Sequence, residues 1–355
     1  MIQALLKRAK FEYELTFFDY NKEVGNRERA EKYFGEYGIS FRECNDLDYR
    51  ISSRNDAVWE HISYNHYTET SCDIYHFMNI VSLPLSITGK VIVTAHDFNW
   101  RTYNKALSDH ARSLCDKGLE RLNILQPEII AISQSTKNEL LEYSNIPEEK
   151  INVVLQSYDE RNLYPDPDYP KEIVDGNYLL FIGTIESKKN VTLIADAFFT
   201  IADRYPDLRL VIVGKPTWED MSSFYKMVDE SKFRDRVILP GYVDVTVKRK
   251  LYSHARCFLF PSICEGWGNP ILEAMACGCP VITSNVTAMP EAGGDAALYI
   301  SGNDPELLVE KIDAVLASDG IRNTMIRKGL EHSRLFSWDK TASEVESVYR
   351  KVLGQ

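Results

Sequence analysis

The feature that most constrains the fold is a regular alternation of short β-branched runs with helical patterns along the whole chain. The strand candidates are YELTFF at 13–18, DIYHF at 73–77, VIVTA at 91–95, EIIAIS at 128–133, INVVL at 151–155, LLFIG at 179–183, RLVIVG at 209–214, RVIL at 236–239, CFLF at 257–260, PVIT at 280–283 and ALYI at 297–300. Between the third and fourth runs, apolar residues recur every three or four positions from Leu107 to Leu122, as on a helix that packs one face on a sheet. Strands that alternate with helices predict an α/β fold with doubly wound parallel sheets.

The chain length of 355 residues suits two domains, because a single core seldom grows past about 250 to 300 residues. Three prolines and many charges interrupt the apolar rhythm at 156–177, as linkers do. We therefore expect a first domain at 1–165, a linker at 166–177 and a second domain at 178–336, with a cleft between the domains. The segment 337–355 begins with a Ser cap and carries an apolar stripe, so it predicts a final helix that packs on either domain, including back on the first.

The composition is that of a globular protein, with 44% hydrophobic and 26% charged residues. A formal net charge of −11 argues against a nucleic-acid partner, because such binding needs clustered Lys and Arg. Charges interrupt the opening segment too early for a signal peptide or a membrane span, so we expect a cytoplasmic protein. The scattered cysteines predict reduced thiols, and Cys277 and Cys279 are too closely spaced for a zinc site.

The stretch CEGWGNPILEAMACGCPV, residues 264–281, contains two glutamates around a stiff turn. Glu265 follows the strand CFLF, and ligands of open parallel sheets bind beyond the carboxyl ends of strands. Gly266 and Gly268 should let the backbone turn tightly and approach a ligand, and Pro270 suits the first turn of a helix that runs to about Cys277.

Such a helix start offers unpaired amide groups and partial positive charge to an anion near Asn269, Ile271 and Leu272. Glu265 before the turn and Glu273 in the first helical turn could then contact separate parts of an extended ligand with phosphates between them, as in a sugar nucleotide. The alternative is structural: Glu273 complements the helix dipole and Glu265 caps a loop amide.

From about Asp73 onward the sequence resembles the retaining glycosyltransferases of family 4, which have the GT-B architecture of two facing Rossmann-like domains. The family signature is E-G-[FWY]-G-x-P-x-x-E-A-M-A-x-G-x-P-V, and residues 265–281 read EGWGNPILEAMACGCPV. Other stretches are similar to the mannosyltransferase-type branch of this family: FIGTIESKKN (181–190), LVIVGKP (210–216), LPGYVD (239–244), TSNVTAMPEAGGDAALYI (283–300) and FSWDKTA (336–342). The resemblance implies transfer of a hexose, most often mannose from GDP-mannose, with retained anomeric configuration, to a glycan or lipid-linked glycan of a surface polysaccharide.

The resemblance also implies roles for individual residues. Glu265 lies near the transferred sugar, His96 of TAHDFNW approaches that sugar, and Lys189 pairs with the diphosphate. The implied donor-binding set is Glu273 at the ribose, Tyr242 and Val243 at the base, and Gly183, Thr184, Lys188, Gly268, Asn269, Pro270, Ile271 and Leu272 around the phosphates. The structural alternatives are a satisfied interior histidine and a solvated lysine at a helix start.

Thr184 stands where many relatives carry a phosphate-binding Arg. The resemblance therefore implies that Lys189 and the helix amides mainly compensate the negative charge of the leaving diphosphate. Lys188 and Lys215 can assist, and Asp97 is expected to orient the His96 loop. No Asp-x-Asp follows a strand, and DPD at 166–168 is more simply a turn, so we expect neither a catalytic metal nor a cofactor. Retention is then expected through a same-face substitution in which the leaving phosphate accepts the proton.

Two departures from the family pattern leave a second function open. Relatives usually begin with a strand and a glycine-rich loop, whereas MIQALLKRAK resembles the helix after them. Either this strand is absent, which leaves a sheet edge open and a catalytic loop missing, or the sequence omits residues before Met1. Gln156 and Ser157 replace an Asn-Gly pair at the hinge. The alternative to an active transferase is therefore a non-catalytic partner subunit that keeps the donor pocket. Basic residues near the start, such as Lys7, are candidates for peripheral contact with anionic lipid, or an ordinary solvated face; the oligomeric state stays open.

Overall fold

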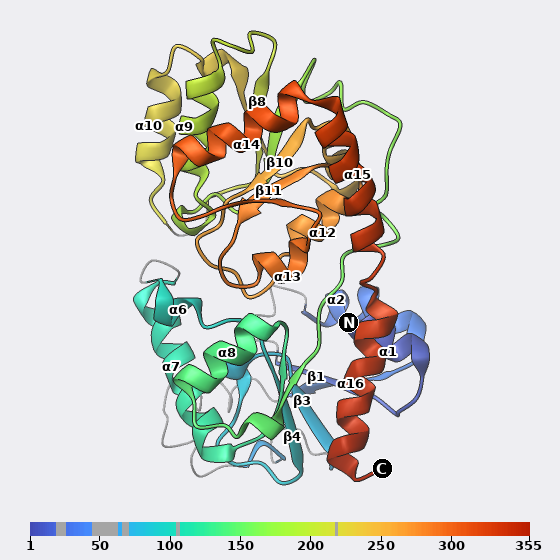
Figure 1. Ribbon diagram of the computed structural model, residues 1–355. Coiled ribbons are helices and arrows are strands. Elements are labelled where there is room, and N and C mark those ends of the chain that lie inside the picture. Colours follow the sequence, from blue (N-terminus) through green and yellow to red (C-terminus); the bar gives the residue numbers. More distant parts are fainter. Residues whose placement is uncertain (19–25, 45–62, 66–70, 104–106, 217–218) are drawn as a thin grey trace.

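The chain folds into two α/β halves, which Figure 1 shows one above the other, and this arrangement confirms the predicted fold class. The computed structural model describes residues 1–18, 26–44, 63–65, 71–103, 107–216 and 219–355. The first half contains α1 (Ile2–Arg8), β1 (Glu14–Phe18), α2 (Asn26–Phe34), β2 (Ser40–Cys44), β3 (Ile74–Phe77), β4 (Lys90–Ala95), α6 (Asn99–Thr102), α7 (Asp109–Leu125), β5 (Glu128–Ala131), α8 (Gln134–Tyr143) and β6 (Ile151–Val153). The second half contains β7 (Tyr178–Ile182), α9 (Val191–Ile201), β8 (Arg209–Val213), α10 (Ser222–Glu230), β9 (Val237–Gly241), α11 (Val245–His254), β10 (Cys257–Phe260), α12 (Asn269–Ala276), β11 (Val281–Ser284), α13 (Met289–Gly293), β12 (Leu298–Ile300), α14 (Pro305–Ala317) and α15 (Asp319–Ser333).

The second half is built on one six-stranded parallel sheet with the order β12-β11-β10-β7-β8-β9. All six strands predicted from the sequence are present in it. The residues of β7, β10 and β11 are buried throughout, as expected for strands covered by helices on both faces. The chain leaves β7 toward β8 on one side and reaches β10 on the other, so the order reverses between β7 and β10. Loops that follow these two strands meet at the point where open α/β sheets bind ligands.

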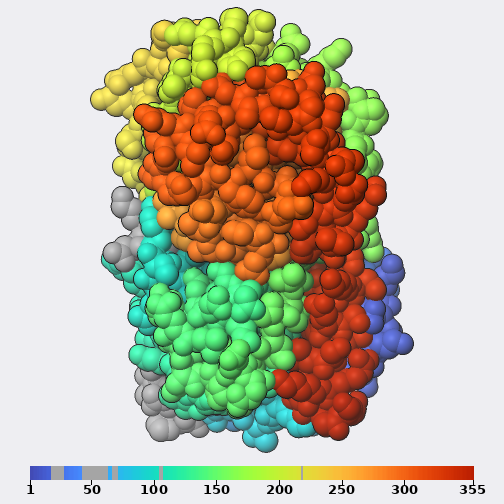
Figure 2. All heavy atoms as spheres, viewed as in Figure 1, coloured from blue at the N-terminus to red at the C-terminus, as the bar shows by residue number. Residues whose placement is uncertain are grey.

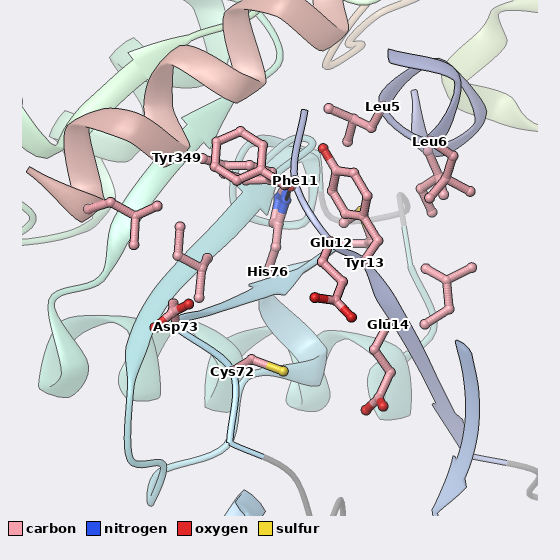
Figure 3. Close-up of a pocket in the computed structure, with 15 residues that line it drawn as sticks. Leu5, Leu6, Phe11, Glu12, Tyr13, Glu14, Cys72, Asp73, His76 and Tyr349 are labelled. Carbon is pink, nitrogen blue, oxygen red and sulfur yellow. Dashed lines mark hydrogen bonds between the residues drawn. The ribbon is translucent and has the colours of Figure 1, made fainter. Parts of the chain in front are cut away.

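The first half differs from the prediction, because its predicted strands do not form one sheet. β3, β4, β5 and β6 form a four-stranded parallel sheet in that order. β1 pairs instead with β2, a strand that the sequence pattern did not reveal. Among the described residues no strand joins β1 to β3, and a cavity of about 250 Å³ lies between the two sheets (Figure 3). Figure 3 shows Glu12, Tyr13 and Glu14 on one side of this cavity and His76 of β3 on the other.

The final helix, α16 (Trp338–Leu353), packs on the first half and ties the two ends of the chain together. Ser337 caps it as predicted, because its hydroxyl accepts a hydrogen bond from the amide of Lys340 at 3.1 Å. Its apolar side chains share a core cluster with Leu5 of α1, Ile92 of β4 and Ile130 of β5. In Figure 2 this C-terminal segment runs down from the second half along the flank of the first. The helix therefore carries the end of the chain from the second half back onto the first.

His76 is held in the seam between β3 and α16. Its Nδ1 lies 2.7 Å from the hydroxyl of Tyr349, and its Nε2 lies 2.8 Å from the hydroxyl of Thr94. Burial lowers the pKa of His76 to about 4. No site motif includes His76, and this packing gives it a structural role.

Stability should consequently fall with acidification through His76. The unfolded chain binds a proton at this residue near pH 6.5, whereas the folded chain does so only near pH 4. The contribution of neutral His76 to the free energy of unfolding is therefore complete above about pH 6.5. It declines by up to about 3 kcal/mol as the pH drops to 4. Urea unfolding of the wild type and of His76→Gln at pH 7 and pH 4.5 measures it: the wild type should lose more stability over this interval. Equal losses in the two proteins would contradict this assignment.

Candidate active site

A pocket of about 700 Å³ opens at the carboxyl ends of β7, β8 and β9. Its lining brings together five predicted donor-binding residues: Gly183, Thr184, Tyr242, Val243 and Glu273. Tyr242 is 77% exposed, so its ring can stack on a flat ligand. The loops after β7 and β8 approach closely, because a Cβ on Gly214 would lie only 1.8 Å from the carbonyl oxygen of Gly183. The backbone beside the pocket therefore requires glycine at position 214.

Glu273 of α12 faces this pocket and is held by two side chains of α11. Oε2 of Glu273 lies 2.5 Å from Nζ of Lys248 and accepts a hydrogen bond from the hydroxyl of Tyr252 at 3.2 Å. Neither Lys248 nor Tyr252 was predicted from the sequence. A signal existed, because Val245, Lys248 and Tyr252 recur at steps of three and four, and Asp244 caps the helix through the amides of residues 246 and 247. The contacts with Lys248 and Tyr252 orient the Glu273 carboxylate at the pocket.

Glu265 forms a second ion pair, with Lys189. Lys189 lies in the loop between β7 and α9, and its Nζ is 5.3 Å from the centre of the Phe260 ring. The two loops are joined because the amide of Ile263 donates to the carbonyl oxygen of Lys188 at 2.8 Å. The amide of Glu265 also donates to the hydroxyl of Thr287 at 3.0 Å. The structure thus places Lys189 and Glu265 side by side at the switch point.

Lys188 sits among carboxylates at the same place. Burial lowers its pKa, but the charges of Glu265, Glu186 and Asp97 outweigh burial and raise the pKa above its usual value. Lys188 is therefore a fixed positive charge. Thr184, which stands where relatives carry an arginine, donates instead to Oε1 of Glu186 at 3.0 Å. The cationic potential of this loop comes from the two consecutive lysines.

The start of α12 differs from the prediction. The amides of Ile271 and Leu272, expected to meet an anion, both point to the carbonyl oxygen of Gly268, at 2.9 and 3.3 Å. Both residues are fully buried, and Pro270 has no amide hydrogen. Of these residues, only Asn269 still has a main-chain amide to offer a ligand. The prediction that the amides of Ile271 and Leu272 also bind an anion is wrong.

The explanation given for Gly266 and Gly268 is also wrong. Neither residue has a positive φ angle. A Cβ on Gly266 would lie 1.8 Å from the carbonyl oxygen of His96, and one on Gly268 would lie 2.7 Å from Cβ of Ala292. These glycines are required by close packing inside the protein, and Gly266 is a point of direct contact between the two halves.

His96 follows β4 and lines a different cavity, of about 420 Å³, beside α1 and α2. Its Nε2 lies 2.8 Å from the carbonyl oxygen of Met78, which can only accept, so Nε2 is the donor of this hydrogen bond. The loop is shaped as expected by Asp97, whose Oδ1 accepts the amide of Asn99 at 3.1 Å. The backbone of His96 touches Gly266, whereas its ring faces the cavity of the first half.

Glu139 of α8 is a further carboxylate near the candidate site, and no sequence motif indicated it. Its Oε2 accepts the amide of Phe98 at 3.2 Å. Burial, together with the charge of Asp97, raises the pKa of Glu139 to about 7. The His96 loop therefore rests on a carboxyl group that changes charge near neutral pH.

The DPD segment is a turn, as expected: Oδ1 of Asp166 accepts the amide of Asp168 at 2.9 Å. Oδ2 of Asp166 is bound to Nε of Arg249 at 2.6 Å, which ties this linker to α11. Within the described part of the chain, no three His, Cys, Asp or Glu side chains gather as metal ligands would. No helix in that part has the length and apolar character needed to cross a bilayer.

Comparison with known proteins finds relatives among the glycosyltransferases. Residues 168–332 match the family model described as "Glycosyl transferases group 1". The O-antigen chain mannosyltransferase B of Escherichia coli is 28% identical over 312 residues, which cover 85% of this chain and 79% of that protein. The serotype-specific mannosyltransferase WbdA of the same species is 26% identical over 228 residues; these cover 60% of this chain but only 27% of the relative.

Solved structures show the same fold. A glycosyltransferase from Rickettsia africae superimposes with a TM-score of 0.70 at 16% identity, over 99% of this chain and 93% of that one. Anabaena HepE, solved with UDP and glucose, gives 0.70 at 13% identity, over 92% and 89% of the two chains. The second half of this chain, residues 168–332, is therefore a domain of the glycosyl transferases group 1 family, within a chain of GT-B fold.

Proposed function

We propose that the protein is a retaining mannosyltransferase that moves mannose from GDP-mannose to a glycan of a surface polysaccharide. The observation that carries the proposal is the pair of lysine–glutamate contacts at the switch point, Lys189 with Glu265 and Lys248 with Glu273. Each contact orients one carboxylate beside a lysine, Glu273 at the donor pocket and Glu265 in the loop after β10. A sugar nucleotide has hydroxyl groups at both ends and a diphosphate between them, which suits this arrangement.

In this proposal the base stacks on Tyr242 beside Val243, and Glu273 accepts hydrogen bonds from the ribose hydroxyls. The diphosphate passes Gly183 and Thr184 toward Lys188 and Lys189, and the sugar reaches Glu265. This assignment follows the pocket lining and the proximity of the two loops. The choice of mannose and of an O-antigen-like product follows the names of the E. coli relatives.

The proposed chemistry is a substitution on one face of the sugar. The bond from the anomeric carbon to the phosphate oxygen breaks, the bond to the acceptor oxygen forms on the same face, and the acceptor proton passes to the leaving phosphate. Charge on the diphosphate increases as its bond breaks, and Lys188 and Lys189 are held in place to stabilise that charge. We propose that these lysines do the work of a metal ion and that no cofactor takes part.

The acceptor is proposed to lie in the cavity that His96 lines. Tyr33 there is 55% exposed and offers an aromatic face to a sugar ring, and Gln156 offers an amide. Nδ1 of His96 can accept a hydrogen bond from a sugar hydroxyl. Because the other described lining residues carry no side-chain charge, a neutral glycan end suits the cavity; a lipid-linked glycan would present such an end at the inner face of the membrane.

Calorimetric titration with GDP, UDP and dTDP tests the proposal. GDP should bind, GDP-mannose should bind at least as tightly, and UDP and dTDP should bind at least about tenfold more weakly, a difference of about 1.4 kcal/mol. Preference for UDP would overturn the choice of donor. Binding of none of the three would overturn the donor pocket itself.

A further inference from the structure

The first turn of α8 is completed by a side chain from the other half of the molecule. An α-helix leaves its first four amide groups without helical partners. In α8 the amide of Lys137 has the ordinary helical partner, the carbonyl oxygen of Ser133, at 3.1 Å. Of the amides before it, that of Thr136 donates to the hydroxyl of Ser133 at 2.9 Å, and those of Gln134 and Ser135 donate to Glu291.

Glu291 reaches these amides from α13 of the second half. Its Oε2 accepts the amide of Gln134 at 2.7 Å, and its Oε1 accepts the amide of Ser135 at 2.8 Å. A carboxylate at a helix N-terminus also gains from the helix dipole, and such charged hydrogen bonds are roughly twice as strong as neutral ones. In Figure 1, α13 lies at the edge of the second half that faces α8.

The contact is connected on both sides to the candidate active site. On the first half, the hydroxyl of Thr136 reaches the carbonyl oxygens of His96 at 3.1 Å and Gly266 at 3.4 Å. On the second half, Ala292 packs against Gly268, where a Cβ would come within 2.7 Å. Ala292, next to Glu291, thus contacts the loop that carries Glu265, and Thr136, two residues after Gln134, contacts the loop that carries His96.

We propose that Glu291 is a positioning residue that latches the two halves in the arrangement needed for sugar transfer. The inference rests on the proposed function. Glu291 lies outside the donor pocket, so its loss should leave nucleotide binding unchanged. The transfer step requires both halves at once, and it should slow when the latch is removed, because reacting groups displaced by about 1 Å can cost a hundredfold in rate.

The test uses Glu291→Ala in the full chain, with Glu331→Ala as control; Glu331 is an exposed carboxylate of α15 whose described partner is Arg327 of the same helix. Hydrogen exchange at residues 134–135 should become at least about tenfold faster in Glu291→Ala and stay unchanged in the control. The kcat of transfer should fall at least about tenfold, while the dissociation constant for GDP stays within about twofold. Unchanged exchange would overturn the latch, and faster exchange with unchanged kcat would overturn its role in positioning.

A double-mutant cycle separates the latch from a general loss of stability. Gln134→Pro removes one of the two amide donors at a helix position where proline is favoured. If the latch acts through that amide, Gln134→Pro should lower kcat in the wild type but have little further effect in Glu291→Ala. Additive effects would overturn the proposed contact. If the wild type binds no nucleotide and transfers no sugar, the proposed function fails, while the exchange measurement still decides the latch.

Discussion

Glu273→Ala should weaken the binding of GDP by about a hundredfold or more. Hydrogen bonds to a charged group contribute about 1.5 to 3 kcal/mol each, and the proposed ribose contact uses the Glu273 carboxylate for two of them. The change also leaves Lys248 without the carboxylate that lies 2.5 Å from it. Calorimetric titration of GDP into the variant and the wild type measures the effect.

The matched control for this prediction is Glu310→Ala, because Glu310 is an exposed carboxylate of α14 with Lys311 as its described partner. GDP binding by the control should equal that of the wild type. Circular dichroism of Glu273→Ala should show a folded protein with a melting temperature near that of the control. Binding by folded Glu273→Ala within about threefold of the wild type would show that this carboxylate does not hold the ribose.

Gly266→Ala should nearly abolish transfer while leaving nucleotide binding intact. The new Cβ would lie 1.8 Å from the carbonyl oxygen of His96 and 2.8 Å from Cβ of Asp97. Because these neighbours are backbone and a loop anchored by Glu139, the two halves must separate by an ångström or so. We expect kcat to fall about a hundredfold. The donor pocket is lined mainly by residues of the second half, together with Asp159 and Leu163, and Gly266 is not part of its lining.

Gly320→Ala is the control, since a Cβ there would meet only the hydroxyl of Ser318, at an ordinary 3.7 Å. The kcat and the GDP dissociation constant of the control should match those of the wild type. For Gly266→Ala, steady-state kinetics measures the loss of sugar transfer, and calorimetry measures whether GDP binding is kept. Equal loss of GDP binding and transfer would mean that the substitution damages the second half itself, against the packing described here.

The sequence predicted the second half well because local pattern and tertiary role coincide there. β7, β10 and β11 are buried on both faces, so each appears as an uninterrupted apolar run. β2 was missed for the opposite reason. Its sequence, SFREC, has charged residues and pairs only with β1 among the described strands, so no run of apolar residues marks it. The division of the first half into two sheets likewise depends on pairing between distant segments.

The sequence predicted the main residues of the candidate site but only some of the side chains that they contact. The motif at 265–281 located Glu265 and Glu273, and the structure places each against a lysine. Lys189 was among the predicted residues, whereas Lys248 lies on another helix and has no motif of its own. The purpose of Gly266 could not be inferred, because the carbonyl oxygen that excludes a side chain there belongs to His96, in the other half.

The central claim, sugar transfer with retention from GDP-mannose, is tested most directly by following the reaction itself. The full chain would be incubated with GDP-α-mannose and a panel of mannose-terminated oligosaccharides, with water as the fallback acceptor, and the products examined by mass spectrometry and NMR. The account predicts release of GDP and a product one hexose heavier whose new anomeric centre is α. A β-configured product would contradict retention. Bound GDP-mannose with no turnover toward any acceptor or water would contradict the enzyme and favour the partner-subunit alternative.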